Sequence, residues 1–458
     1  MSVSNGRAPA RTAGAGVDWD AVADLRGRVA VQLEEHRRQP RYAGMDAADE
    51  RALAVSLVAG EVERWVLDLA GGGRPAPTAD AERRLASAVL GALFGLGRLE
   101  GLLSRDDVEN VHIHGHDRVV LELADGRHEP GPPVAGSDAE LVELLAGYAA
   151  RAGQTSREFS PAHPTLNLRL PGGGPLGCRL AAVIEVTPRP AVAIRRHRLA
   201  RAGLDELRRL GTVEAAVQAF LQAAVRAGLN IVVSGAPAAG KTTLLRALAL
   251  EAPPAEHLVT VEEEYELGLH LLHPDRLITA MEARQPNAEG AGAVTLHELL
   301  TQALRHSPAR VVVGEVRGGE VTAMLAALAN GAAGGMCTLH ARSAAGVFTR
   351  IGQLAQLAAP PMPAETAWRF AADAIDLVVH LDRDQTGRFV TEVVEVGRVG
   401  DAAMPESTRL FAPRPADGRA APAYSPSTGL RARLVQAGFD PAWLDHPAGT
   451  PPAGRDRR

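Results

Sequence analysis

The segment NIVVSGAPAAGKTTLLRALAL, residues 230–250, constrains the fold of this chain more than any other stretch. Its apolar beginning predicts a buried strand, and its end predicts a helix. Residues 235–242 between them follow the pattern Gly-x-x-x-x-Gly-Lys-Thr. Between a strand and a helix, this pattern forms a loop whose backbone N–H groups bind phosphate together with the helix N-terminus. We therefore expect an α/β domain built around a phosphate-binding loop.

Lys241 lies in this loop and is the only lysine in a chain that has 49 lysine and arginine residues. Its compact ammonium is expected to reach the β- and γ-phosphates of a nucleotide, a position that the bulkier guanidinium of arginine does not fit. The hydroxyl of the next residue, Thr242, is expected to ligate Mg²⁺. The residues assigned to nucleotide binding are Gly235, Ala236, Pro237, Ala238, Ala239, Gly240, Lys241, Thr242 and Thr243.

The composition argues against several classes of protein. The net charge of −5 provides no global basic field, so a nucleic-acid partner is not expected. The two cysteines, Cys178 and Cys337, lie far apart, which argues against a disulfide scaffold and a cysteine zinc site and fits a reducing cytoplasm. The N-terminus lacks the apolar segment of a secretory signal. The uncharged run over residues 322–339 contains several glycines, so it predicts a buried helix, a loop and a strand rather than a membrane span.

The pattern along the chain predicts five parts. Residues 1–75 are expected to form a disordered start and a helical extension, residues 76–200 a small α+β domain, and residues 201–213 a linker. Residues 214–405 alternate helix and strand, which predicts a mainly parallel sheet that ends in a hairpin. Residues 406–458 are rich in proline and alanine, and they predict a tail that is mostly loop with one short helix.

Three further strands of the parallel sheet are each expected to lead into polar side chains. One precedes an acidic run that includes Glu263 and Glu266, one precedes Glu315, and one ends at His340. Ligand sites of such sheets lie at the carboxyl ends of the strands, so these groups and Lys241 should gather at one rim. ATP hydrolysis needs such a set, because it uses carboxylates to hold Mg²⁺ and orient water, and donors that contact the γ-phosphate.

Four segments carry a family resemblance: GAPAAGKTT, TVEEEYEL, the run from MEARQPN to GEVRGGEV, and GGMCTLHARSA. In this order they resemble the type II/type IV secretion ATPase superfamily, and ARQPN, GEVRGGE and TLHARS are most similar to its tight-adherence (Flp) pilus branch. The resemblance covers about residues 80–405. It implies a RecA-like P-loop NTPase domain preceded by a smaller α+β, PAS-like domain. It also implies a cytoplasmic homo-hexamer, peripheral to the inner face of the cell membrane, that hydrolyses ATP to power pilus assembly or protein secretion through an inner-membrane platform protein.

The resemblance also implies roles for single residues. Glu266 matches the glutamate that acts as general base toward water, and Glu315 matches the acidic residue that supports Mg²⁺ through water. His340 matches a histidine near the γ-phosphate. The arginines that match nucleotide-contacting positions, some of them across subunits, are Arg284, Arg305 and Arg317, and those that match the segment before the linker are Arg195 and Arg196.

Two residues depart from the family pattern. Ala238 stands where the family usually has glycine, and an alanine is tolerated there if its φ is negative. Glu263 replaces an aspartate, which keeps the charge but lengthens the side chain that would face Mg²⁺. These departures support an alternative function, in which the chain is an ATP-binding scaffold component of the same kind of machine that hydrolyses little ATP.

Two other interpretations stay open at this point. The motif HIHGH places His112, His114 and His116 at alternating positions, so a strand would put all three on one face, as a metal site could use. The second open interpretation is that the chain is a DNA-translocating ATPase with a RecA-like domain, although the net charge of −5 counts against it.

Overall fold

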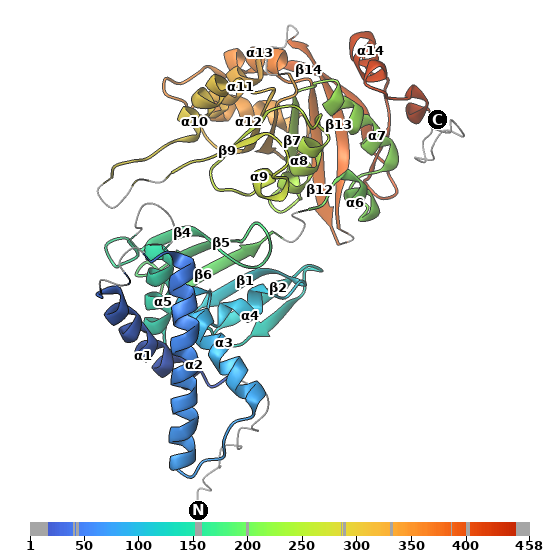
Figure 1. The fold of residues 1–458 in the computed structure, drawn as a ribbon. Coiled ribbons are helices and arrows are strands. Elements are labelled where there is room, and N and C mark those ends of the chain that lie inside the picture. The colour runs from blue at the N-terminus through green and yellow to red at the C-terminus, as the bar shows by residue number, and fades with distance from the viewer. Residues whose placement is uncertain are drawn as a thin grey trace, which may run out of the picture. The chain divides into compact units, whose positions relative to one another are not determined.

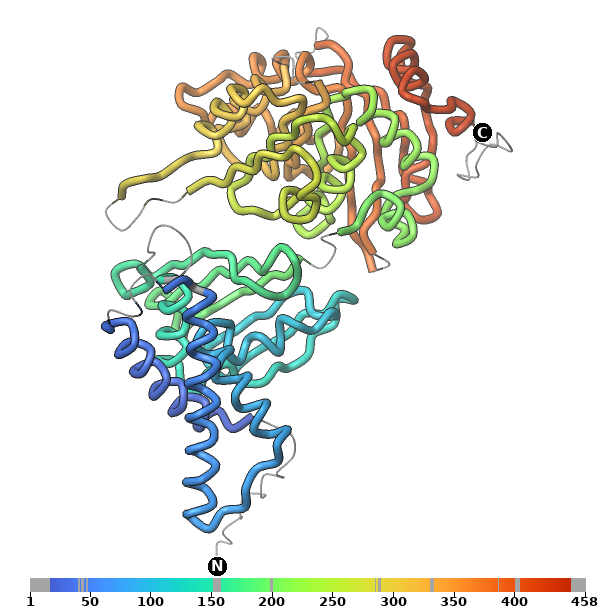
Figure 2. Tube along the Cα trace, viewed as in Figure 1, coloured from blue at the N-terminus to red at the C-terminus, as the bar shows by residue number. Residues whose placement is uncertain are grey.

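The structure of this chain is a computed structural model, and its backbone forms two compact units that divide after Arg196 (Figure 2). The disordered start predicted within residues 1–75 falls on residues 1–16, outside the described residues. The described residues are 17–39, 42, 45–151, 158–197, 201–284, 286, 290–329, 333–385, 387–399 and 404–445.

Three long helices open the first unit (Figure 1), and the first two form the helical extension predicted within residues 1–75. They begin after the side chains of Asp18, Asp46 and Thr78, which accept hydrogen bonds from the first free N–H groups of each helix. Leu25 and Val58 lie in the apolar core that the three helices share. The helices of this unit are α1 (Trp19–Arg37), α2 (Ala47–Gly71), α3 (Ala79–Phe94), α4 (Leu99–Leu103) and α5 (Asp138–Arg151).

An antiparallel sheet completes the first unit. Among the described residues it has six strands in the order β3-β2-β1-β6-β5-β4. Burial alternates along β4, so one face of the strand packs on the core and the other is exposed, as expected for an antiparallel sheet. Together with the helices of this unit, the sheet confirms the α+β character predicted for residues 76–200. The strands are β1 (Val108–His114), β2 (Val119–Leu123), β3 (His128–Gly131), β4 (Thr165–Leu170), β5 (Cys178–Val183) and β6 (Ala191–Arg196).

The second unit is built on a mixed sheet, whose described strands run in the order β15-β14-β13-β12-β7-β11-β10-β8-β9. The strands from β12 to β9 in this order are parallel, and β13, β14 and β15 continue the sheet in antiparallel pairs. The predicted parallel sheet and its final hairpin are therefore confirmed. The strands are β7 (Ile231–Gly235), β8 (Leu258–Glu262), β9 (Ile278–Glu282), β10 (Arg310–Val316), β11 (Met336–His340), β12 (Leu377–Asp384), β13 (Gly387–Val399), β14 (Pro405–Pro413) and β15 (Ala420–Pro422).

Helices cover both faces of this sheet (Figure 1). Ile231 and Val233 of β7 pack into the core formed with α6, α7, α8 and α14, whereas Val232 packs into the core formed with α10 to α13. A central strand with two apolar faces explains why its sequence is continuously apolar. The helices are α6 (Leu204–Arg209), α7 (Ala215–Arg226), α8 (Lys241–Leu250), α9 (Leu269–Leu272), α10 (Leu296–Ala303), α11 (Val321–Ala329), α12 (Gly346–Ala355), α13 (Ala364–Ala374) and α14 (Thr428–Gln436), with 3₁₀ turns η2 (Leu304–His306) and η3 (Pro441–Leu444).

Two expectations about connecting segments differ from the structure. The predicted linker, residues 201–213, contains α6, whose Leu204 and Leu207 are buried in the second unit. Over residues 406–445, the described part of the predicted tail, the chain is not mostly loop, because β14 and β15 extend the sheet. Phe411 of β14 stacks edge-on against Phe220 of α7, with ring centroids 5.3 Å apart. That contact joins residues far apart in sequence, so the local proline content could not reveal it.

The uncharged run over residues 322–339 contains most of α11 and of β11, and this prediction is confirmed. Over the described ranges, no helix combines the length and the apolar character that crossing a membrane requires.

Candidate active site

The candidate site lies at the carboxyl ends of four adjacent parallel strands, β7, β11, β10 and β8. His340, the last residue of β11, pairs in register with Gly235, the first residue of the predicted phosphate loop. Because the strands are neighbours and parallel, the side chains that follow them meet at one rim of the sheet. The structure thus brings together groups that are up to 99 residues apart in sequence, such as Lys241 and His340.

The loop between β7 and α8 has the backbone that its glycines predict. Gly235 has a φ of 154° and Gly240 has a φ of 93°, and a Cβ at Gly235 would lie only 2.5 Å from the carbonyl oxygen of Leu381. No side chain caps the N-terminus of α8, which begins at Lys241. Its first N–H groups, and the positive end of the helix dipole, are therefore oriented to bind an anion.

The backbone of Ala238 does not meet the condition of a negative φ under which an alanine was expected to be tolerated in the loop. Its φ is 59°, in the left-handed region, rather than negative. A side chain there places the Cβ close to the backbone, which costs about 1–2 kcal/mol relative to the right-handed region. The carbonyl oxygen of Ala238 accepts a hydrogen bond of 2.8 Å from Nε of Arg388, a residue of β13.

Four side chains form a continuous row of contacts across the site. Lys241 is a buried residue, only 6% exposed; its ammonium donates to the carbonyl oxygen of Ala236 at 2.9 Å and lies 3.2 Å from Nδ1 of His340. The Nε2 atom of His340 lies 2.6 Å from Glu315, and Arg317 donates to the other oxygen of that carboxylate. Since an ammonium can only donate, His340 accepts at Nδ1 and donates from Nε2 to Glu315.

The Glu315 carboxylate is held in its ionised form. Burial opposes its ionisation, but the hydrogen bonds from His340 and Arg317 and the charge of Arg317 outweigh burial and lower the pKa of Glu315 to about 2. Burial likewise opposes the charge of Arg317, yet Glu315, Glu266 and Glu263 together raise the pKa of Arg317. One carboxylate near the end of β10 and two carboxylates that follow β8 therefore act electrostatically on one arginine.

Glu266 is held from two sides. Its carboxylate accepts a hydrogen bond of 3.3 Å from the hydroxyl of Thr242. Its backbone N–H and that of Leu267 both donate to Oε2 of Glu262, at 2.8 and 2.7 Å. Arg246 of α8 donates to the carbonyl oxygens of the same two residues. The segment that carries Glu266 is thus fixed at its backbone, which orients its side chain toward the phosphate loop.

Glu262 and Arg246 are site residues that sequence reasoning did not assign. Glu262 is only 2% exposed, its Oε1 has no hydrogen-bond partner among the described residues, and burial raises its pKa to about 7. A run of glutamates is typical of a solvated loop, so nothing in the run distinguished its first member as buried. Arg246 did give a signal, because it is the one charged residue in the otherwise apolar run of α8 after Lys241.

The residues expected to hold Mg²⁺ supply suitable atoms. Thr242 offers a hydroxyl, and Glu263 and Glu315 offer carboxylates that follow neighbouring strands. Within the described ranges no three His, Cys, Asp or Glu side chains form a metal cluster. The hydroxyl of Thr242 and the two carboxylates fit Mg²⁺, because proteins usually hold this ion through one or two oxygen ligands and the phosphates of the substrate.

The predicted arginines differ in their exposure and in the contacts that they make. Arg317 joins the row, but Arg284 and Arg305 are exposed and take part in none of the contacts described above. Arg284 donates to the carbonyl oxygen of Gly292 within its own loop. In the first unit, Arg195 is exposed, whereas Arg196 is buried and donates to backbone carbonyls of that unit, including Val108 at 2.9 Å. These hydrogen bonds of Arg196 stabilise the backbone of the first unit, and a role for Arg195 or Arg196 in nucleotide binding stays a prediction.

A pocket of about 810 Å³ opens beside the first half of the phosphate loop. Sequence reasoning had assigned the loop and His340 to the site, but not the residues of α12 and of the segment before it. These additional lining residues are Ala341, Arg342, Gly346, Thr349, Arg350 and Gln353.

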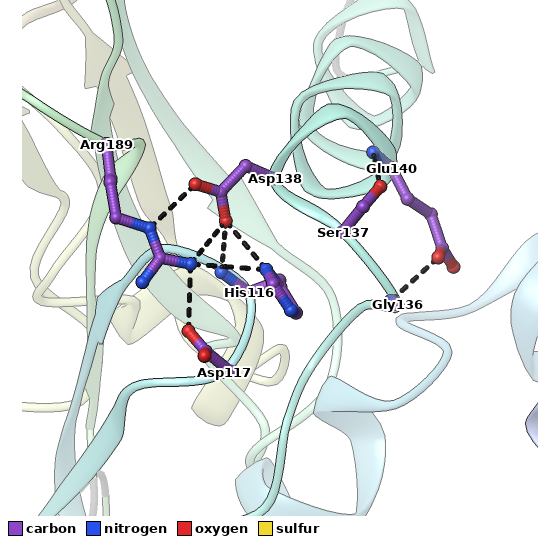
Figure 3. Close-up of polar contacts among 7 residues, drawn as sticks. All are labelled: His116, Asp117, Gly136, Ser137, Asp138, Glu140 and Arg189. Atoms are coloured by element: carbon purple, nitrogen blue, oxygen red, sulfur yellow. Dashed lines mark hydrogen bonds and ion pairs between the residues drawn. The ribbon is translucent and has the colours of Figure 1, made fainter.

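The HIHGH histidines do not share one strand face. β1 ends at His114, and Gly115, with a φ of 72°, turns the chain so that His116 leaves the sheet. Figure 3 shows the ring of His116 against Asp138, at 2.8 Å, with Arg189 bridging Asp138 and Asp117. His116 thus belongs to an ion-pair network that ties the start of α5 to two loops, and the three imidazoles do not converge.

Comparison with known proteins identifies the family. The sequence model described as "Type II/IV secretion system protein" matches residues 150–388. A protein of Mycobacterium tuberculosis that is named a conjugal transfer protein is 36% identical over 300 residues, which cover 65% of this chain and 82% of the relative. The type IV secretion system protein PtlH of Bordetella pertussis is 32% identical over 324 residues, which cover 63% and 90%.

Among solved structures, the VirB11 ATPase of the Brucella suis type IV secretion system aligns with 26% identity and a TM-score of 0.35, over 67% of this chain and 95% of that one. The family model covers more than half of the 458 residues, and it includes the phosphate loop, Glu266, Glu315 and His340. This chain therefore belongs to the type II/IV secretion system protein family, and it is an ATPase of that family.

Proposed function

We propose that this chain is a homo-hexameric motor that hydrolyses Mg²⁺-ATP in the cytoplasm, at the inner face of the cell membrane, and acts on an inner-membrane platform protein. The observation that carries the proposal is the row from Lys241 through His340 and Glu315 to Arg317, next to a loop shaped for an anion. In this proposal, residues 76–200 form the N-terminal domain. Residues 214–405 form the ATPase domain.

Each side chain has a defined task in this proposal. Lys241 exchanges its contacts with Ala236 and His340 for the β- and γ-phosphates. Glu266 takes a proton from the attacking water, and it is pre-oriented because Glu262 and Arg246 hold its backbone. His340 donates from Nε2 to Glu315 and is positioned to respond when Lys241 leaves Nδ1.

Thr242, Glu263 and Glu315 would hold Mg²⁺, which neutralises phosphate charge when bound. Among the arginines, Arg317 acts within its own subunit. The exposed Arg284 and Arg305 contact nucleotide bound to a neighbouring subunit.

The pathway is proposed at two levels. The names of the relatives, a conjugal transfer protein and a type IV secretion protein, favour a machine that moves macromolecules across the cell envelope. The motifs ARQPN, GEVRGGE and TLHARS favour the tight-adherence pilus branch of the family. Co-purification with a membrane platform protein and a small pilin would support the pilus, whereas capture with the other components of a type IV secretion channel would contradict it.

Phosphate release tests the motor directly. The full chain is assayed with ATP, with and without Mg²⁺, alongside Lys241→Ala as the matched inactive control. We expect Mg²⁺-dependent release that Lys241→Ala lacks. Release no greater than that of the control, even with the membrane partner present, would refute the motor.

The second candidate is an ATP-binding scaffold that hydrolyses little. It is favoured by the left-handed φ of Ala238, which places an alanine in a strained conformation in the loop that must hold phosphate. The same assay separates the two functions, because a scaffold binds ATP with Lys241-dependent affinity but shows no turnover above Lys241→Ala.

A further inference from the structure

We propose that Arg388 is a positioning residue that holds the phosphate loop in its anion-binding conformation and compensates for the left-handed backbone of Ala238. The inference rests on the proposed role of the loop in nucleotide binding. Arg388 lies 150 residues after Ala238, at the start of β13, and no motif in the sequence connects the two.

The β12–β13 hairpin touches the loop at three points. The carbonyl oxygen of Leu381 in β12 lies so close to Gly235 that only glycine fits there. The aliphatic part of the Arg388 side chain lies against Gly240, where a Cβ would be 3.4 Å from Cδ of Arg388. Between these contacts, Nε of Arg388 donates to the carbonyl oxygen of Ala238 at 2.8 Å. The hairpin therefore supports the beginning, the middle and the end of the loop.

The hydrogen bond on Ala238 is transmitted to Lys241 through one peptide plane. The C=O and N–H of a trans peptide point in opposite directions, so fixing the carbonyl of Ala238 also fixes the N–H of Ala239. That N–H donates to the carbonyl oxygen of Ala236 at 3.3 Å, and the same oxygen accepts from the ammonium of Lys241 at 2.9 Å. Arg388 thereby fixes the peptide between Ala238 and Ala239 and the turn whose carbonyl oxygen also holds the Lys241 ammonium.

The compensation follows from the cost of the left-handed conformation. Alanine populates a φ of +59° far less readily than glycine, so the loop of this chain would relax if no contact held it. A charge-assisted hydrogen bond from a guanidinium is strong enough to offset that preference. A loop with glycine at this position would need Arg388 less, and this difference is what an experiment can detect.

The first measurement is equilibrium binding of ADP and of a non-hydrolysable ATP analogue to the full chain. We expect Arg388→Ala to raise the Kd about tenfold, the loss typical of one charge-assisted hydrogen bond. Arg383→Ala is the matched control, because Arg383 is an exposed arginine that pairs with Arg388 in the same hairpin, and its Kd should stay within about twofold of wild type. An unchanged Kd for a folded Arg388→Ala chain would overturn the proposal.

The second measurement tests compensation itself. Arg388→Ala is repeated in an Ala238→Gly background, where we expect its effect on the Kd to shrink to about threefold or less, because glycine adopts the conformation without help. Equal effects in the two backgrounds would show that Arg388 does not compensate for Ala238. If Arg388→Ala caused a general folding defect, its effect would also be equal in the two backgrounds, because glycine at position 238 cannot repair such a defect.

Two precautions keep the outcome interpretable. If Arg388→Ala fails to fold, Arg388→Lys takes its place in the same pair of backgrounds, since lysine keeps the charge and loses the Nε–H donor. Lys241→Ala is measured in parallel. If Lys241→Ala binds nucleotide as wild type does, the proposed role of the loop fails, which is distinct from failure of Arg388 alone.

Discussion

At the scale of single residues, Glu266 decides whether the site is catalytic. Its carboxylate is positioned by Thr242, and its backbone by Glu262 and Arg246. We expect Glu266→Gln to bind ATP within about threefold of wild type and to lose at least about 100-fold in kcat, because glutamine accepts hydrogen bonds but takes no proton. Phosphate release and nucleotide binding measure the two quantities. Glu264→Gln, two residues earlier, is the control, and near wild-type turnover of Glu266→Gln would move the base to Glu263 or Glu315.

The ionisation of Glu262 should make the stability of the protein depend on pH. Burial raises its pKa from 4.5 to about 7, so its contribution to stability is complete below pH 4.5 and is lost as the pH rises through 7. The loss amounts to about 3 kcal/mol, since each unit of pKa shift is worth about 1.4 kcal/mol. Glu262→Gln cannot ionise and should therefore gain stability relative to wild type between pH 5 and 8. Urea unfolding at several pH values measures this difference, and parallel curves for the two chains would contradict it.

At the scale of elements, β14 should be an integral part of the second unit. Phe411 is completely buried, and its ring packs against Phe220 of α7. We expect Phe411→Ala to lower the free energy of unfolding by about 3–5 kcal/mol, as truncation of a buried phenylalanine does. Ser407→Ala on an exposed position of the same strand should change it by less than about 0.5 kcal/mol. Similar values for both variants would mean that β14 is dispensable.

Elements were predictable where the signal is local. The strand–loop–helix around Lys241 follows from periodicity and two glycines, and the position of His340 and Glu315 at strand ends follows from the rule for parallel sheets. β14 was missed because prolines stand at both of its ends and because Phe220, against which its Phe411 packs, is distant in sequence. Arg388 was missed for the same reason: only sheet pairing brings the start of β13 to the loop.

Within the site, burial was the quantity that sequence could not supply. Glu262 and Glu263 are adjacent and chemically identical, yet the first is buried beneath the segment of Glu266 and the second is exposed. Arg195 and Arg196 differ in the same way, because neighbouring residues of a strand point to opposite faces. Family resemblance named both arginines, and only the fold separates them.

At the scale of the whole molecule, a variant of the exposed Arg305 can test whether the chain acts as a ring or as a monomer. If it acts on nucleotide bound to a neighbour, chains with Arg305→Ala and chains with Glu266→Gln are each inactive alone but complement each other when mixed. In a mixed ring, some sites combine an intact Glu266 with an intact neighbouring Arg305. We therefore expect mixing to restore a measurable part of the phosphate release. Arg305→Ala mixed with Lys241→Ala should recover likewise, whereas no recovery in either mixture would place Arg305 outside the site.

Because Lys241 is the only lysine, proteolysis at this residue can report local opening of the phosphate loop. A lysine-specific protease has one possible cut, after Lys241, and that bond lies at the start of α8, where the side chain is buried. Cleavage into fragments 1–241 and 242–458 therefore requires the loop and the first turn of α8 to open locally. Nucleotide that binds the closed loop should slow the cut in proportion to occupancy. The residue proposed to hold the phosphates would then record, as two fragments on a gel, how often the loop opens.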